Sequence, residues 1–177
     1  ALNAILFTET HSMLKMYEAI DDEEKIEYYQ KQVARIADNF NLYFFQVDHN
    51  RYCDFNAETQ EYTVAENTIG YCLWSGIANQ SIADVYAHEI AKDINSDEIF
   101  YRLANSDIDP GYLYLMAFGF KLFNYAQIQE ALKSIYTNSV DFEFMNNNKL
   151  FVKKYDSKTV EYSTYMAAIY LLMTNYF

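Results

Sequence analysis

The stretch ALNAILFTETHSMLKMYEAIDDEEKIEYYQKQVARIADNFNLYFF, residues 1–45, decides the fold. Its first half carries apolar residues at Leu2, Ile5, Leu6, Met13, Leu14 and Tyr17. Its second half carries them at Ile26, Tyr29, Val33, Ile36, Ala37 and Phe40. Spacings of three and four residues place each set on one face of a helix, which predicts helices over residues 2–19 and 22–44. Since only a short acidic turn separates them, the two helices should form an antiparallel hairpin.

Composition supports a helical protein with a substantial core. The chain has 177 residues, of which 51% are hydrophobic and 18% aromatic, so disorder is not expected. Only four Gly and one Pro are present, and scarcity of these turn residues favours long helices. The length suits a single helical domain over residues 1–177, either a whole protein or a fragment of a larger one.

Residues beyond 45 continue the pattern of helices after one interruption. Polar turns are expected at 46–50 and 56–60, with a short extended piece at 51–55 between them. Further helices are expected over 66–74, from an N-cap at Asn79 to about Asp93, from Pro110 to about 124, and over 126–145. Residues 153–157 are expected to form a loop, and a last helix should start near Tyr162. The fold class is therefore all-α, with antiparallel helical hairpins as in an α/α toroid or a plain helical bundle.

Net charge narrows the range of partners. The formal charge of −12 disfavours nucleic acid and anionic membranes as partners, whereas a neutral sugar is compatible with it. Residues 162–177 carry no charge, but they fall short of the ~20 apolar residues that a membrane span requires. We expect a soluble protein whose closing helix is buried.

Cysteine and histidine positions predict neither a metal nor a cofactor. Cys53 and Cys72 form no CxxC pair, and two free core thiols are favoured over a disulfide. The three histidines, His11, His49 and His88, are dispersed along the chain. Free thiols make the cytoplasm the default location, although a secreted or periplasmic location stays open.

Seven short segments occur in a characteristic order: residues 2–6, 34–45, 52–56, 73–84, 119–121, 149–156 and 161–162. They include LNAIL, YCDFN, LWSGIAN, GFK and KYD. In this order they resemble the C-terminal half of trehalases, which are inverting glycoside hydrolases with an α/α toroid fold. The resemblance implies a partial toroid and the hydrolysis of α,α-trehalose as the family's activity.

The catalytic carboxylates that the resemblance implies are not found where they should be. An inverting glycosidase needs an acid and a base whose carboxyl groups lie ~6.5–9.5 Å apart. The family's acid belongs to a segment before the motif that starts at Leu2, so we expect this chain to lack it. The family's base corresponds to Lys153, and an ammonium group cannot take that role near neutral pH. Whether the chain is an enzyme is therefore uncertain, and we expect a pseudoenzyme when it acts alone.

Four residues are candidates for binding a sugar. The resemblance implies that Glu161 faces the sugar pocket, and it leaves Asp107 and Asp109 in the loop where the family has tryptophans. Trp74, the sole tryptophan, could stack on a sugar ring. Each also has an ordinary role: a solvated helix start for Glu161, turn residues for the aspartates, and a core position for Trp74.

Two further interpretations stand beside a trehalase-like hydrolase. The chain could be a non-catalytic scaffold that binds a carbohydrate or a protein, or an unrelated helical bundle. The partners that we expect are a small sugar, such as trehalose or glucose, and a protein or second copy held through exposed helix faces.

Overall fold

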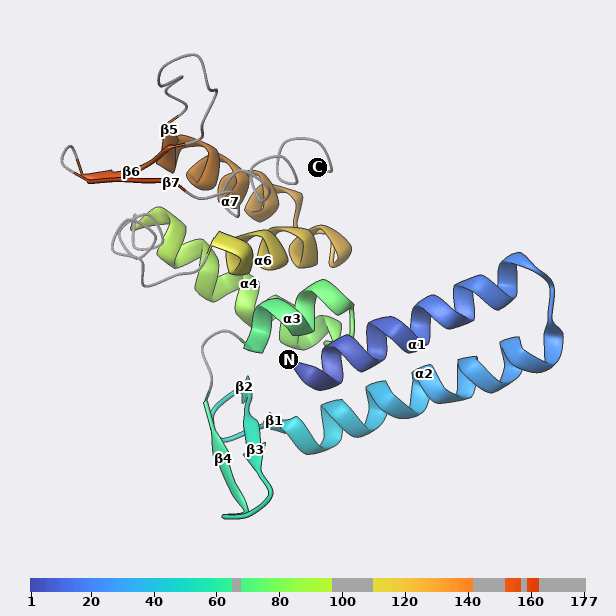
Figure 1. The fold of residues 1–177 in the computed structure, drawn as a ribbon. Helices are drawn as coiled ribbons and strands as arrows, with labels where there is room; N and C mark the ends of the chain where they lie inside the picture. The colour runs from blue at the N-terminus through green and yellow to red at the C-terminus, as the bar shows by residue number, and fades with distance from the viewer. Residues whose placement is uncertain (65–67, 97–109, 142–151, 157–158, 163–177) are drawn as a thin grey trace. The chain divides into compact units, whose positions relative to one another are not determined.

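The computed structural model describes residues 1–64, 68–96, 110–141, 152–156 and 159–162 (Figure 1). Helices dominate these residues and confirm the all-α class with antiparallel hairpins. The chain divides into two compact units, residues 1–83 and residues 84–177. The single-domain interpretation stays a prediction.

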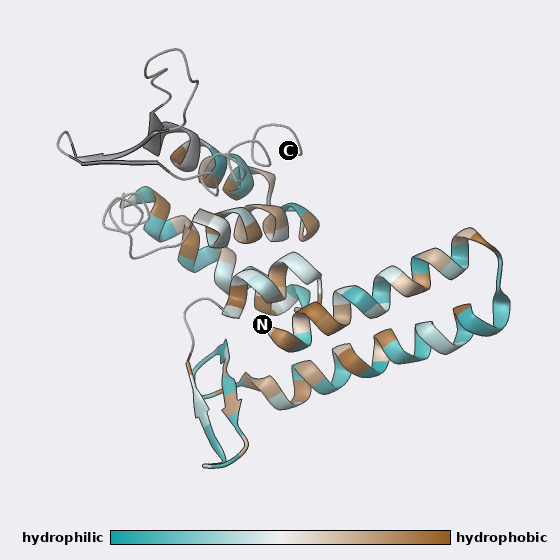
Figure 2. Ribbon diagram, in the orientation of Figure 1, coloured by the Kyte–Doolittle hydropathy of each residue, from teal (hydrophilic) through white to brown (hydrophobic). Residues whose placement is uncertain are grey.

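A long helical hairpin opens the first unit and confirms both predicted helices. Helix α1 spans Leu2–Ala19, and helix α2 spans Glu23–Phe44. The side chain of Asp22 caps α2 by accepting a hydrogen bond from the backbone N–H of Lys25 at 3.2 Å. In Figure 2 hydrophobic residues concentrate in the half of the hairpin that contains the N-terminus. This half therefore supplies the apolar surface against which the rest of the unit packs.

Two small hairpins follow α2. Strand β1 (Phe45–Gln46) pairs antiparallel with β2 (Arg51–Tyr52), and β3 (Asp54–Asn56) pairs antiparallel with β4 (Glu61–Thr63). The Oδ1 atom of Asn56 accepts hydrogen bonds from the N–H groups of Glu58 and Thr59, at 2.9 and 3.3 Å, which shapes the second turn. Both predicted turns and the extended piece are confirmed, whereas β4 was not anticipated.

Helix α3 belongs to the first unit, and helix α4 runs from the first unit into the second. Helix α3 spans Thr68–Ser75 and packs against α1. The chain then breaks at Gly76, whose φ of +74° lies in the left-handed region that favours glycine. Helix α4 spans Gln80–Asn95, directly after Asn79 as expected for an N-cap position. The carbonyl of Asn79 accepts the first hydrogen bonds of this helix.

A second helical hairpin forms the core of the second unit. Helix α6 spans Pro110–Leu122 and starts at the predicted proline, and helix α7 spans Ala126–Ser139. The two helices pack against each other. Their fully buried residues are Leu113, Met116, Ala117, Phe120 and Leu132. The helices are joined by a three-residue turn in which the N–H of Tyr125 donates to the carbonyl of Phe120 at 2.8 Å. A connection this short makes the two helices antiparallel.

The end of the described chain corrects two predictions. Helix α7 stops at Ser139 instead of reaching residue 145, because β5 (Val140–Asp141) follows it directly. The predicted loop at 153–157 is largely strand β6 (Val152–Asp156), and Thr159–Tyr162 form β7. The helix predicted to start near Tyr162 falls on residues 163–177, outside the residues that the structure describes. The three strands form an antiparallel sheet in the order β5-β6-β7. Valine, threonine and tyrosine recur in these segments and favour extended backbone, which explains the difference.

Both cysteines are free and buried, which confirms the prediction of two core thiols. Burial raises the pKa of the Cys72 thiol to about 12. Burial likewise raises the pKa of the Cys53 thiol, and the neighbouring Asp54 carboxylate adds to this. Because only the thiolate is a strong nucleophile, neither cysteine is suited to nucleophilic chemistry at neutral pH.

Candidate functional site

Three of the segments that carry the trehalase resemblance meet at the side chain of Asn41. Its Nδ2 atom donates to the carbonyl of Ile77, after α3, at 2.9 Å and to the carbonyl of Ala37, in α2, at 2.8 Å. Its Oδ1 atom accepts a hydrogen bond from the hydroxyl of Tyr52, in β2. One amide therefore ties α2, β2 and the chain after α3 together, which is a structural role.

Aromatic packing holds the Tyr52 end of this network. The ring of Tyr52 is 2% exposed, and its centroid lies 5.0 Å from that of Phe40 and 5.5 Å from that of Phe45. Asp54, two residues on, is exposed on β3 and takes no part in the network. The segment at 52–56 therefore anchors the small hairpins to α2, in keeping with a structural role for this loop.

Lys153 and Glu161 lie directly opposite each other in the β6–β7 hairpin. The antiparallel register pairs Lys153 with Glu161, between the pairs Val152–Tyr162 and Lys154–Val160. The structure thus places at one level of one hairpin the two positions that the resemblance assigns to water activation and to the sugar pocket.

The remaining sequence candidates lie outside the β6–β7 hairpin in the sequence. Trp74 is half-buried in α3, within the first unit. Asp107 and Asp109 lie outside the residues that the structure describes. Their assignment to a sugar site stays a prediction.

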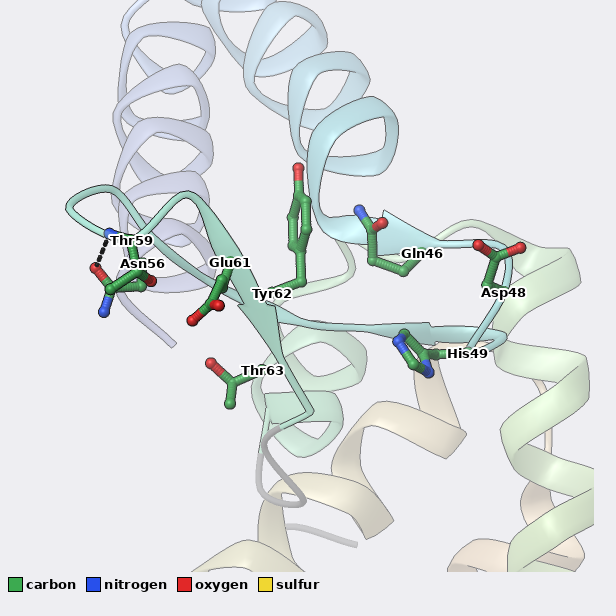
Figure 3. Close-up of a pocket in the computed structure, with 8 residues that line it drawn as sticks. All are labelled: Gln46, Asp48, His49, Asn56, Thr59, Glu61, Tyr62 and Thr63. Atoms are coloured by element: carbon green, nitrogen blue, oxygen red, sulfur yellow. Dashed lines mark hydrogen bonds between the residues drawn. The ribbon is translucent and has the colours of Figure 1, made fainter.

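A polar pocket between the two small hairpins was missed by the sequence analysis. Its volume is about 550 Å³, and Figure 3 shows the eight residues that line it. They are Gln46, Asp48, His49, Asn56, Thr59, Glu61, Tyr62 and Thr63. Several of them were assigned to turns, and a turn assignment does not show that the two hairpins lie side by side. The placement of the β1–β2 hairpin beside the β3–β4 hairpin is what gathers them.

The described residues contain neither a cluster of metal ligands nor a membrane-spanning helix. Among them, no three His, Cys, Asp or Glu side chains are grouped so that they could hold a metal ion. No helix among the same residues has the length and apolar character needed to cross a membrane.

Comparison with known proteins defines the class. A family model described as Trehalase matches residues 1–111, which include α1 to α4 and the Asn41 network. The match covers more than half of the 177 residues, so the chain belongs to the trehalase family of glycoside hydrolases. Lys153 and Glu161 lie beyond the matched residues. A search of curated proteins finds no match for the chain.

Proposed function

We propose that this chain is a trehalase-like glycoside hydrolase domain that does not hydrolyse α,α-trehalose by itself. The observation that carries the proposal is the lysine at position 153, at the same level of the β6–β7 hairpin as Glu161. Membership of the trehalase family supports the class of protein and the class of substrate.

The chemistry of inversion explains why Lys153 matters. A carboxylate must take a proton from the water that attacks the sugar, and an ammonium group has no lone pair to accept it. Loss of a general base typically slows a reaction by about 10²–10⁴-fold. The register supports this assignment, since a base and a sugar-contacting glutamate are both expected at one site, and positions 153 and 161 are cross-strand partners.

A glucose-release assay on the purified 177-residue chain, with trehalose as substrate, tests the proposal. We expect no glucose above the level of a blank, while an active trehalase in the same buffer shows that the assay works. The chain with Glu161→Gln, purified in the same way, is the matched control for contaminating enzyme. Glucose release by the unmodified chain that disappears in the Glu161→Gln variant would contradict the proposal, because it would show turnover at this hairpin.

A non-catalytic scaffold that associates with a second copy is the alternative, and an apolar groove on the first unit favours it. Five apolar or aromatic residues and three polar ones line the groove: Leu6, Ile36, Phe40, Tyr43, Phe44, Asn3, Arg35 and Asn39. Its volume is about 190 Å³. Leu2 and Leu42 are 79% and 69% exposed, so the helix ends that form the groove present further apolar surface to solvent. Exposed apolar surface of this kind is typical of interfaces.

Sedimentation velocity over a range of concentrations tests self-association. We expect the sedimentation coefficient of the unmodified chain to rise with concentration and that of the Leu6→Glu variant to stay constant, because a charge in the groove opposes apolar contact. Met16→Glu is the matched control, since Met16 is an exposed apolar residue of the same helix outside the groove. A coefficient that does not change with concentration, or equal effects of the two variants, would exclude this role for the groove.

A further inference from the structure

Two opposite charges lie near each other on α2, at the edge of the apolar groove of the first unit. Arg35 lines the groove, and Asp38 comes three residues later, directly before the groove residue Asn39. All three residues are exposed to solvent. A cation and an anion three residues apart on a helix are neighbours on its surface and can pair with each other. Whether they do so decides whether their charges are available to another molecule.

The guanidinium of Arg35 bonds to a neutral residue instead of to Asp38. Its Nη2 atom donates to the Oε1 atom of Gln32 at 2.6 Å, toward the start of α2. Among the residues that the structure describes, neither Arg35 nor Asp38 takes part in an ion pair. A guanidinium has five N–H groups, so Arg35 keeps free donors, and the carboxylate of Asp38 keeps its oxygens as acceptors. Both charges can therefore pair with a second molecule.

The groove beside these charges has the size of a protein contact. Its volume of about 190 Å³ is below the roughly 300–1,000 Å³ that is typical of small-molecule sites, so side chains of a partner protein suit it better. Leu42 and Tyr43, about one turn after Asp38, are 69% and 58% exposed and extend the apolar surface. In Figure 2 this end of the hairpin is its more hydrophobic end. Apolar surface with a few charges at its edge is typical of protein–protein interfaces.

The two charges are complementary to a second copy of the same face. In a dimer with two-fold symmetry, a residue that contacts another across the interface is contacted by it in return. If two α2 helices cross in opposite directions between positions 35 and 38, each Arg35 meets the Asp38 of the other copy. Two ion pairs then form together, and because Arg35 also lines the groove, each copy covers the groove of the other at its edge.

We propose that this face of α2 is the interface of a two-fold dimer of the chain, in which Arg35 of each copy pairs with Asp38 of the other. The proposal rests on the self-association proposed above for the groove, and it adds the residues that select the partner and its orientation. The net charge of −12 makes the copies repel each other, so the ion pairs contribute more to specificity than to affinity. We expect a dissociation constant on the order of 10–100 µM.

Charge reversal tests the pairing, with sedimentation velocity as the measurement. Arg35→Asp places like charges at both contacts, and Asp38→Arg does the same with the opposite sign. Each variant alone should therefore dimerise about tenfold more weakly or worse. An equimolar mixture of the two variants restores opposite charges at both contacts, and so does the double variant R35D/D38R in a single chain. We expect the mixture and the double variant to sediment as the unmodified chain does.

Lys25→Asp and Glu24→Arg are the matched controls. They change the net charge by the same amounts as the two reversals, at exposed positions of α2 that do not line the groove. Both should associate as the unmodified chain does, and circular dichroism shows whether each variant is folded. Because recovery in the mixture requires two folded chains, it cannot arise from a variant that fails to fold.

The outcomes separate this proposal from the one on which it rests. A mixture that associates no better than its components, or controls as disruptive as the reversals, would overturn the pairing of Arg35 with Asp38. If Leu6→Glu prevents association while the charge reversals do not, the role of the groove stands and the pairing alone is wrong. If the unmodified chain does not associate at any concentration, both proposals fail.

Discussion

Replacement of Asn41 by alanine should lower the free energy of unfolding of the first unit by about 2–3 kcal/mol. The change removes the donor to the carbonyl of Ile77 and the acceptor for the hydroxyl of Tyr52. Each buried polar group that loses its partner costs about 1–3 kcal/mol. Because Asn41 is only partly buried, we expect the combined cost for the Ile77 carbonyl and the Tyr52 hydroxyl to stay below the maximum for two such groups. Urea denaturation followed by tryptophan fluorescence measures this effect, because the sole tryptophan, Trp74, lies in the same unit.

Two further variants distinguish the stability lost with the hydrogen bonds of Asn41 from the general effect of a substitution. Asn39→Ala removes the same type of side chain from an exposed position of α2 and should change stability by no more than about 0.5 kcal/mol. Tyr52→Phe keeps the packed ring and removes only the hydroxyl, so it should cost about 1–2 kcal/mol. Equal losses for Asn41→Ala and Asn39→Ala would show that the network adds nothing to stability.

Replacement of Phe120 by alanine should destabilise the second unit by about 3–5 kcal/mol, the largest effect that we expect. The side chain of Phe120 has no exposed surface, and its ring meets that of Tyr125 edge-on, with centroids 6.0 Å apart and planes at 90°. Alanine removes this contact and leaves a cavity in the core, which the surrounding residues can close only in part. Hydrogen exchange of the α6 and α7 amides reports on this unit directly.

Leu122→Ala is the matched control for the core substitution. Leu122 lies two residues along the same helix but is 49% exposed, so its loss should leave the exchange rates nearly unchanged. If Phe120→Ala also left the α6 amides as protected as before, the helical hairpin would not depend on this core residue, and the packing described above would be wrong.

The parts of the chain that the sequence predicted well depend on short-range interactions. The limits of α1 and α2 were predicted to within one residue, because α-helical hydrogen bonds join residues four apart and the apolar stripe repeats with the same period. Gly76, Asn79 and Pro110 likewise mark helix boundaries through their own backbone and capping preferences. The order of the short motifs was enough to indicate the trehalase family, which the match over residues 1–111 confirms.

The tertiary structure alone decided which distant residues meet. Strands of two to five residues are too short for an alternating pattern to reveal them, so the opposition of Lys153 to Glu161 became visible only through the register of β6 and β7. In the same way, side-by-side placement of the two small hairpins creates the polar pocket. The partners of Asn41 lie up to 36 residues away along the chain. A helix can be predicted from its own residues, whereas a strand pair, a buried amide and a pocket depend on segments that only the folded chain brings together.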